Sequence, residues 1–144
     1  MVYLRSLFLL LFLFVFSFCG MSQSIRIENR YGTAVYFVEQ NVLKSKNRYG
    51  DSVLFYSDNT LRLKNRYGEP LYYLDKDVVK VKNRYGEPLL FFDGNFIKSR
   101  NRYGENLYYL DGNVLKRTNR YGEPVYYFEE SPHRWVLAAV ILFL

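Results

Sequence analysis

Between residues 24 and 130 the hydrophobic positions fall into short runs separated by turn-forming residues. Two kinds of run alternate: an apolar, aromatic one such as LYYL at 71–74, and an apolar, basic one such as VVKVK at 78–82. Runs of this length that are rich in Tyr, Phe, Val and Leu and bounded by turn residues indicate β-strands. Gly68 and Pro70 would interrupt a helix here, so the pattern predicts an all-β domain.

The runs recur with a fixed period of 18 residues, marked by the motif NRYG. The motif begins at Asn29, Asn47, Asn65, Asn83, Asn101 and Asn119. Residues 24–28, SIRIE, resemble the end of a unit, and the last unit departs from the pattern after Glu130. A fixed internal period indicates a repeat architecture, in which each unit is one supersecondary element.

Two tight turns are expected in each unit. Asn at the first position and Gly at the fourth suit a type I turn, and we expect the glycine to adopt the left-handed conformation that closes a hairpin with a bulge. The second turn reads DGN at 93–95 and 111–113. The sequence therefore predicts a twelve-stranded antiparallel meander of six hairpin repeats that closes into a shallow barrel, with residues 24–28 paired to 125–129 so that no edge remains.

Residues 1–22 have one early Arg followed by an uncharged apolar stretch, the layout of a secretory signal peptide. We expect cleavage after Ser22. The alternative is a retained N-terminal membrane anchor, because residues 7–21 are nearly long enough to span a bilayer. Lipidation of Cys19 is a third, less favoured alternative, because Phe18 stands where a small residue is usual. Cleavage would remove the single cysteine and so exclude disulfides.

Residues 131–144 are predicted to form a short apolar helix. Ser131 is the expected N-cap and Pro132 the expected first helical residue. The helix is apolar on all sides, so it must be buried in protein or lipid, yet it falls short of the about 20 residues that span a bilayer. Twelve closed strands make a ring roughly 24 Å across, which leaves room for a helix about 10 Å wide. We therefore expect it to plug the barrel, with membrane burial as the alternative.

Hairpins with short DG-type turns that repeat every 18 residues across residues 24–130 resemble the bacterial β-flower proteins. Their hairpins radiate as petals around a shallow barrel. Twelve strands around an apolar C-terminal helix are also similar to the tubby-type barrel shared with the LURP-one and scramblase families. That second resemblance implies action at lipid membranes, but no residue-level match carries lipid-binding residues over to this chain.

Composition favours an anionic partner. The net charge is +6 and aromatic residues make up 19% of the chain, which suits membrane lipid or an acidic envelope glycan. Nucleic acid, which such residues can also bind, is disfavoured by the export signal. The single histidine, His133, has no Cys partner for a zinc site and no triad partners. No asymmetric acid, base or nucleophile is present, so we predict no enzyme activity, cofactor or metal.

The NRYG tips are the sharpest candidate site, because a type I turn explains Asn and Gly but demands neither Arg nor Tyr. In the structural interpretation, Tyr packs on the neighbouring hairpin and Arg stacks on it. In the functional interpretation, the tips form a binding rim. The candidate rim residues are Arg30, Tyr31, Arg48, Tyr49, Arg66, Tyr67, Arg84, Tyr85, Arg102, Tyr103, Arg120 and Tyr121.

The strand lysines allow two interpretations as well. We favour the interpretation that these lysines form a solvated outer face over the alternative of an electropositive band. The strand lysines are Lys44, Lys80, Lys98 and Lys116. The function these features predict is a non-enzymatic, exported cell-envelope repeat protein that acts as a binding or structural module. The alternative is a membrane-surface protein that binds anionic lipid through its tips.

Overall fold

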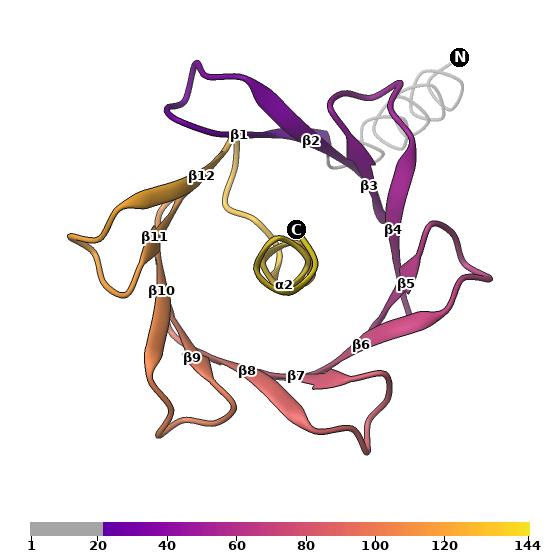
Figure 1. The fold of residues 1–144 in the computed structure, drawn as a ribbon, viewed down its shortest axis with the longest axis vertical. Helices are drawn as coiled ribbons and strands as arrows, with labels where there is room; N and C mark the ends of the chain where they lie inside the picture. Colours follow the sequence, from indigo (N-terminus) through magenta and orange to yellow (C-terminus); the bar gives the residue numbers. More distant parts are fainter. Residues whose placement is uncertain (1–21) are drawn as a thin grey trace, which may run out of the picture.

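The computed structural model describes residues 22–144, which form a ring of twelve strands around one helix (Figure 1). The predicted signal peptide or anchor, including Cys19, lies outside the described residues, except for Ser22, which opens the first strand. The elements are β1 (Ser22–Arg26), β2 (Ala34–Glu39), β3 (Val42–Ser45), β4 (Ser52–Ser57), β5 (Thr60–Leu63), β6 (Pro70–Asp75), β7 (Val78–Val81), β8 (Pro88–Asp93), β9 (Phe96–Ser99), β10 (Asn106–Asp111), β11 (Val114–Arg117), β12 (Pro124–Phe128) and α2 (Arg134–Leu142).

The strands close into an antiparallel barrel in which each strand pairs with its neighbours in sequence and β1 pairs with β12. The predicted fold class is therefore confirmed. The closing strands lie slightly earlier than predicted, at 22–26 and 124–128 instead of 24–28 and 125–129. Closure leaves neither β1 nor β12 as a free edge for pairing with another chain.

The two ends of the repeat region together complete the sixth unit. At the seam, Ile25 pairs with Phe128 and Arg26 with Tyr127. In the first unit, the equivalent residues of β3 and β2 pair in the same register, Leu43 with Val38 and Lys44 with Phe37. The seam thus repeats a standard hairpin in which the connecting turn is absent and β1 supplies the second strand.

Each NRYG tip is a turn held by its asparagine. In the third tip, the Asn65 side-chain oxygen accepts a hydrogen bond from the Tyr67 backbone N–H at 2.9 Å, and the Asn65 carbonyl accepts one from Gly68 N–H at 2.9 Å. The same two bonds recur at all six tips. The tips therefore share one backbone conformation.

The expected left-handed glycine is wrong for these tips. The residue before each asparagine takes that conformation instead, with φ between 60° and 69°: Glu28, Lys46, Lys64, Lys82, Arg100 and Thr118. The motif requires glycine because of close backbone approach. A Cβ at Gly68 would lie 1.7 Å from the Leu63 carbonyl oxygen, and the other five motif glycines face carbonyl oxygens at 1.6–2.0 Å.

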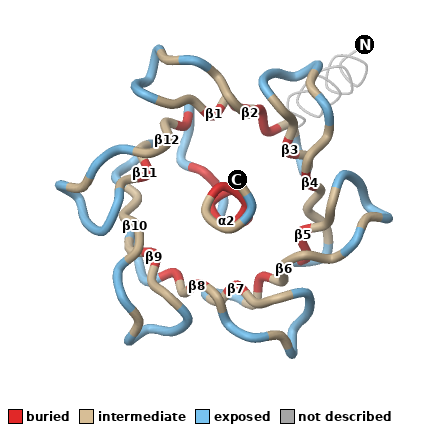
Figure 2. The backbone as a smooth tube through the Cα atoms, in the orientation of Figure 1, coloured by how far each residue is buried: buried red, intermediate tan, exposed pale blue. Residues whose placement is uncertain are grey.

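The core lies inside the ring, where each of the six NRYG hairpins contributes at least one buried residue to a hydrophobic cluster that also includes α2. Figure 2 shows buried backbone along the inner parts of the strands and on α2, and exposed backbone at the hairpin tips. Trp135 is 5% exposed and stacks on Tyr56 with ring centroids 5.4 Å apart. Ala138 and Ala139 are fully buried. The predicted helical plug is thus confirmed.

The helix begins later than predicted, at Arg134, with His133 at the N-cap position and no side-chain cap. The chain must first cross from the barrel wall to the axis (Figure 1), and Pro132 is buried in this crossing segment. Near the start of α2, Arg134 bonds the Lys76 carbonyl and the Asp77 carboxylate. Within residues 22–144, no helix is long and apolar enough to cross a membrane.

Candidate functional site: arginine–tyrosine tips and the grooves beside them

The six tips project outward from the ring (Figure 1). All six tip tyrosines are 86–89% exposed, and all six tip arginines are exposed. The structural interpretation in which each Tyr packs on the neighbouring hairpin is therefore wrong. The backbone of the turn is built by Asn and Gly, and the tyrosine rings contribute no burial to it.

The tip arginines carry unpaired charge. None of them forms an ion pair in the described part of the chain. The Arg48 guanidinium lies 5.8 Å from the ring centroid of Phe37 on the neighbouring hairpin. At two other tips the guanidinium lies 5.9–6.0 Å from its own tyrosine, Tyr85 or Tyr121. Arginine stacking thus occurs, but with different partners at different tips.

The strand lysines hold the tips in place. Lys80 Nζ lies 3.0 Å from the Asp75 carboxylate and donates to the carbonyl of Arg84, in the tip that follows, at 3.0 Å. Lys44, Lys98 and Lys116 make the same pair of contacts. A hydrogen bond from Lys80 lowers the pKa of Asp75, and its positive charge adds to the effect. These lysines are therefore neutralised, which argues against an electropositive band on the strands.

The turn acids have structural partners as well. Asp93 and Asp111 pair with Lys98 and Lys116, and Asp77 pairs with Arg134 at the start of α2. In residues 22–144, no group of three His, Cys, Asp or Glu side chains is placed to hold a metal ion.

A groove lies beside each of four NRYG hairpins, between that hairpin and the next tip. The four grooves have volumes of about 320–700 Å³. Each is lined by the aromatic residue at position 9 of a unit, counted from the asparagine of NRYG, and by the arginine of the next tip. The pairs are Phe55 with Arg66, Tyr73 with Arg84, Phe91 with Arg102, and Tyr127 with Arg30.

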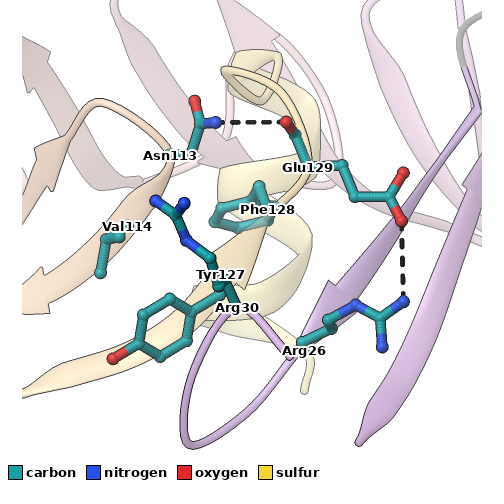
Figure 3. A pocket seen from close by; sticks show the side chains of 7 residues that line it. All are labelled: Arg26, Arg30, Asn113, Val114, Tyr127, Phe128 and Glu129. Atoms are coloured by element: carbon teal, nitrogen blue, oxygen red, sulfur yellow. Dashed lines mark hydrogen bonds and ion pairs between the residues drawn. The ribbon is translucent and has the colours of Figure 1, made fainter. Parts of the chain in front are cut away.

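The groove at the seam contains two arginines (Figure 3). Arg26 forms a 3.8 Å ion pair with Glu129 and donates to the Gly32 carbonyl at 2.9 Å. Arg30 lines the same groove beside Tyr127 and has no ion pair among residues 22–144. The seam therefore repeats the acid–base tie found in four units, with arginine in place of lysine.

The tip residues were predictable from the motif, but the grooves were not. Position 9 is aromatic in all six units: Phe37, Phe55, Tyr73, Phe91, Tyr109 and Tyr127. That regularity was a usable signal. It did not show that in four grooves this residue lies beside the arginine of the next tip, because only the packed ring brings the two together.

Comparisons with protein-family models, with curated proteins and with solved structures gave no significant match.

Proposed function

We propose that this protein is a non-enzymatic binding module, exported to the cell envelope, that uses its ring of arginine–tyrosine tips to bind a surface rich in anionic groups. The observation that carries the proposal is the 86–89% exposure of all six tip tyrosines. A large aromatic side chain repeated six times in solvent contributes nothing to the core. Exposed aromatic and arginine side chains on loops are typical of binding surfaces.

The chemistry of a tip suits an acidic glycan. A guanidinium can bind a carboxylate or a sulfate through two parallel hydrogen bonds. The tyrosine offers a flat apolar face together with a hydroxyl. Because no tip arginine is neutralised by an acid within residues 22–144, its charge is available to a partner.

The arrangement of the tips favours multivalent binding. Lysines such as Lys44 and Lys80 bond tip carbonyls, so the tips are fixed on the barrel. A single exposed charge pair contributes at most about 1 kcal/mol. Several such contacts on one surface raise the overall affinity through effective concentration. A polymer or a dense surface is therefore a better partner than a small free ligand.

A membrane surface containing anionic lipid is the second candidate. α2 starts beside a two-residue turn, where Arg134 bonds Lys76 and Asp77, and near its other end the Leu142 carbonyl accepts a hydrogen bond from the Tyr72 hydroxyl at 3.3 Å. Beyond Leu142, Phe143 is 38% exposed. An exposed apolar residue such as Phe143 could enter a lipid interface while the arginines meet lipid head groups.

The test compares the two partners with the full chain. Binding to an acidic polysaccharide (alginate) and to a neutral one (dextran) is measured by co-sedimentation, and binding to neutral or anionic vesicles by flotation. We expect binding to alginate that weakens as salt rises, and no binding to dextran. Flotation with anionic vesicles alone would favour the lipid candidate. Binding to none of these would contradict the proposal.

Two variants separate charge from geometry. In the first, Arg48, Arg66 and Arg84 are all replaced by Ala, which should reduce binding steeply while leaving the fold intact, because exposed changes of this kind usually cost within about 0.5 kcal/mol. In the matched control they are replaced by Lys, which keeps the charge but loses the guanidinium fork. Unchanged alginate binding by the folded alanine variant would exclude the tips as the site.

A further inference from the structure

One unit lacks the acid–lysine tie that the others use. Position 11 is acidic and position 16 is lysine in four units, and Glu129 with Arg26 replaces this pair at the seam. The second unit has Ser57 and Arg62 at these positions. Arg62 donates to the Gly68 carbonyl at 3.3 Å and forms no ion pair within the described chain. Its remaining donors are available for a ligand.

Arg62 lines the groove of hairpin β5–β6, which has a volume of about 470 Å³. Lys82 and Arg84 line the same groove and have no ion pair among the described residues. Two tyrosines, Tyr73 and Tyr85, complete the wall. A carboxylate lines each of the other three grooves, namely Asp51, then Asp77 with Asp93, and Glu129. The β5–β6 groove thus combines three unpaired cations with no acid in its lining.

We propose that the β5–β6 groove is a binding site for a phosphate or sulfate monoester. Arg62 and Arg84 supply planar forks that fit the oxygens of a tetrahedral oxyanion, and Lys82 adds a point charge. Tyr73 and Tyr85 supply aromatic faces for the organic part of the ester. The volume falls within the about 300–1,000 Å³ that is usual for small-molecule sites.

The site shares Arg84 and Tyr85 with the tip ring, but it does not depend on the avidity proposed for the tips. Three cations line this one groove, so its proposed partner is a single small ester, whereas the tip ring needs a polymer or an extended surface. The second unit also differs at position 14, where Thr60 lines the groove. Two of the other grooves have a valine at this position, Val42 or Val114, and the fourth groove is not lined by this position.

The binding test uses the full chain and small probes in low-salt buffer, measured by calorimetry and by NMR shifts of arginine side chains. The probes are phenyl phosphate, phenyl sulfate, inorganic phosphate and phenol. We expect one or both esters to bind more tightly than inorganic phosphate, and phenol not to bind. Failure of both esters to bind would overturn the proposal. Equal binding of phenyl phosphate and inorganic phosphate would remove the role assigned to the tyrosines.

The decisive variant carries Ser57→Asp and Arg62→Lys, which restores the tie already present in four units and so should fold. We expect its affinity for the ester to fall about tenfold or more, because a charge-assisted hydrogen bond is lost and the site gains a carboxylate. Arg84→Ala should act likewise. The matched control is Lys64→Ala in the β3–β4 groove, at the unit position that Lys82 holds in the β5–β6 groove, which should leave ester binding unchanged. Unaltered binding by the double variant, or an equal loss in the control, would overturn the proposal.

Discussion

Replacing Gly68 by Ala tests why every tip needs glycine. The added Cβ would lie 1.7 Å from the Leu63 carbonyl oxygen and 2.7 Å from its carbon. Both atoms belong to the backbone, so no side-chain rotation can relieve the contact. Either the Leu63 peptide or the turn itself must move by more than an ångström.

The hydrogen bonds around this contact set the size of the effect. The Leu63 carbonyl accepts from Asn65 N–H at 2.8 Å, Leu63 N–H donates to the Glu69 carbonyl at 3.0 Å, and Gly68 N–H donates to the Asn65 carbonyl at 2.9 Å. A shift of this size disrupts two or three of them. At about 0.5–1.5 kcal/mol each, the free energy of unfolding should fall by about 1–4.5 kcal/mol.

Gly112→Ala is the matched control, because it changes the same residue type in a two-residue turn. Gly112 has φ +60°, and a Cβ there would meet nothing within 4 Å. The equivalent turns place Gln40, Asp58 and Lys76 at this position with φ of 51–55°. The chain therefore already tolerates side chains here, and we expect a cost of only about 1 kcal/mol from the left-handed backbone.

Urea unfolding followed by tryptophan fluorescence measures both effects. Trp135 is the single tryptophan and lies inside the barrel against Tyr56, so its emission reports on loss of the core. The m-values of parent and variants should agree if each unfolds from the same native state. The argument from backbone contact would be refuted if Gly68→Ala lowered the free energy of unfolding by no more than Gly112→Ala does.

Two further predictions concern the core and pH. Trp135→Ala should lower the free energy of unfolding by about 3–5 kcal/mol, because it leaves a cavity where a side chain only 5% exposed was packed. Urea unfolding followed by circular dichroism checks this. A loss below about 1 kcal/mol would contradict a packed barrel interior. Lys80 holds the pKa of Asp75 below its usual 3.8, so the stability from this pair is present above 3.8 and is lost as pH falls through the lower pKa of the folded state. Burial raises the pKa of Tyr72 above 10, so its contribution is present below 10 and is lost as pH rises through the folded pKa. Lys80→Met should therefore flatten the acid side of a stability–pH curve and leave the alkaline side unchanged.

The sequence was sufficient to predict the ring because its signals agree with one another. The 18-residue period, the two turns of each unit and the alternation of apolar and polar positions all require hairpins of similar length. The half-unit before Asn29 and the truncated last unit then predict closure. The plug followed from the all-apolar helix, because such a helix must be buried in protein or lipid.

The errors arose where tertiary contacts override local preference. Gly68 was expected to need a left-handed backbone, but Lys64 takes that conformation and Gly68 is needed for clearance. Ser131 and Pro132 form a good local start signal for a helix. The chain at that point must still travel from the wall to the barrel axis, so the helix starts at Arg134. The local sequence around Ser131 carries no information about how far the chain must travel to reach the axis.

A closed ring of near-identical units also changes how substitutions within the repeat should be interpreted. Asn and Gly of the tips are the same in every unit because one backbone geometry is built six times, so their repetition reports on structure. Ser57 and Arg62 differ from the other units although the strand pairing around them is unchanged: Arg62 pairs with Phe55 on one side and with Pro70 on the other, as Lys80 pairs with Tyr73 and Pro88. The fold therefore does not require Ser57 and Arg62 in place of an acid and a lysine. What these two residues change is the chemistry of the β5–β6 groove.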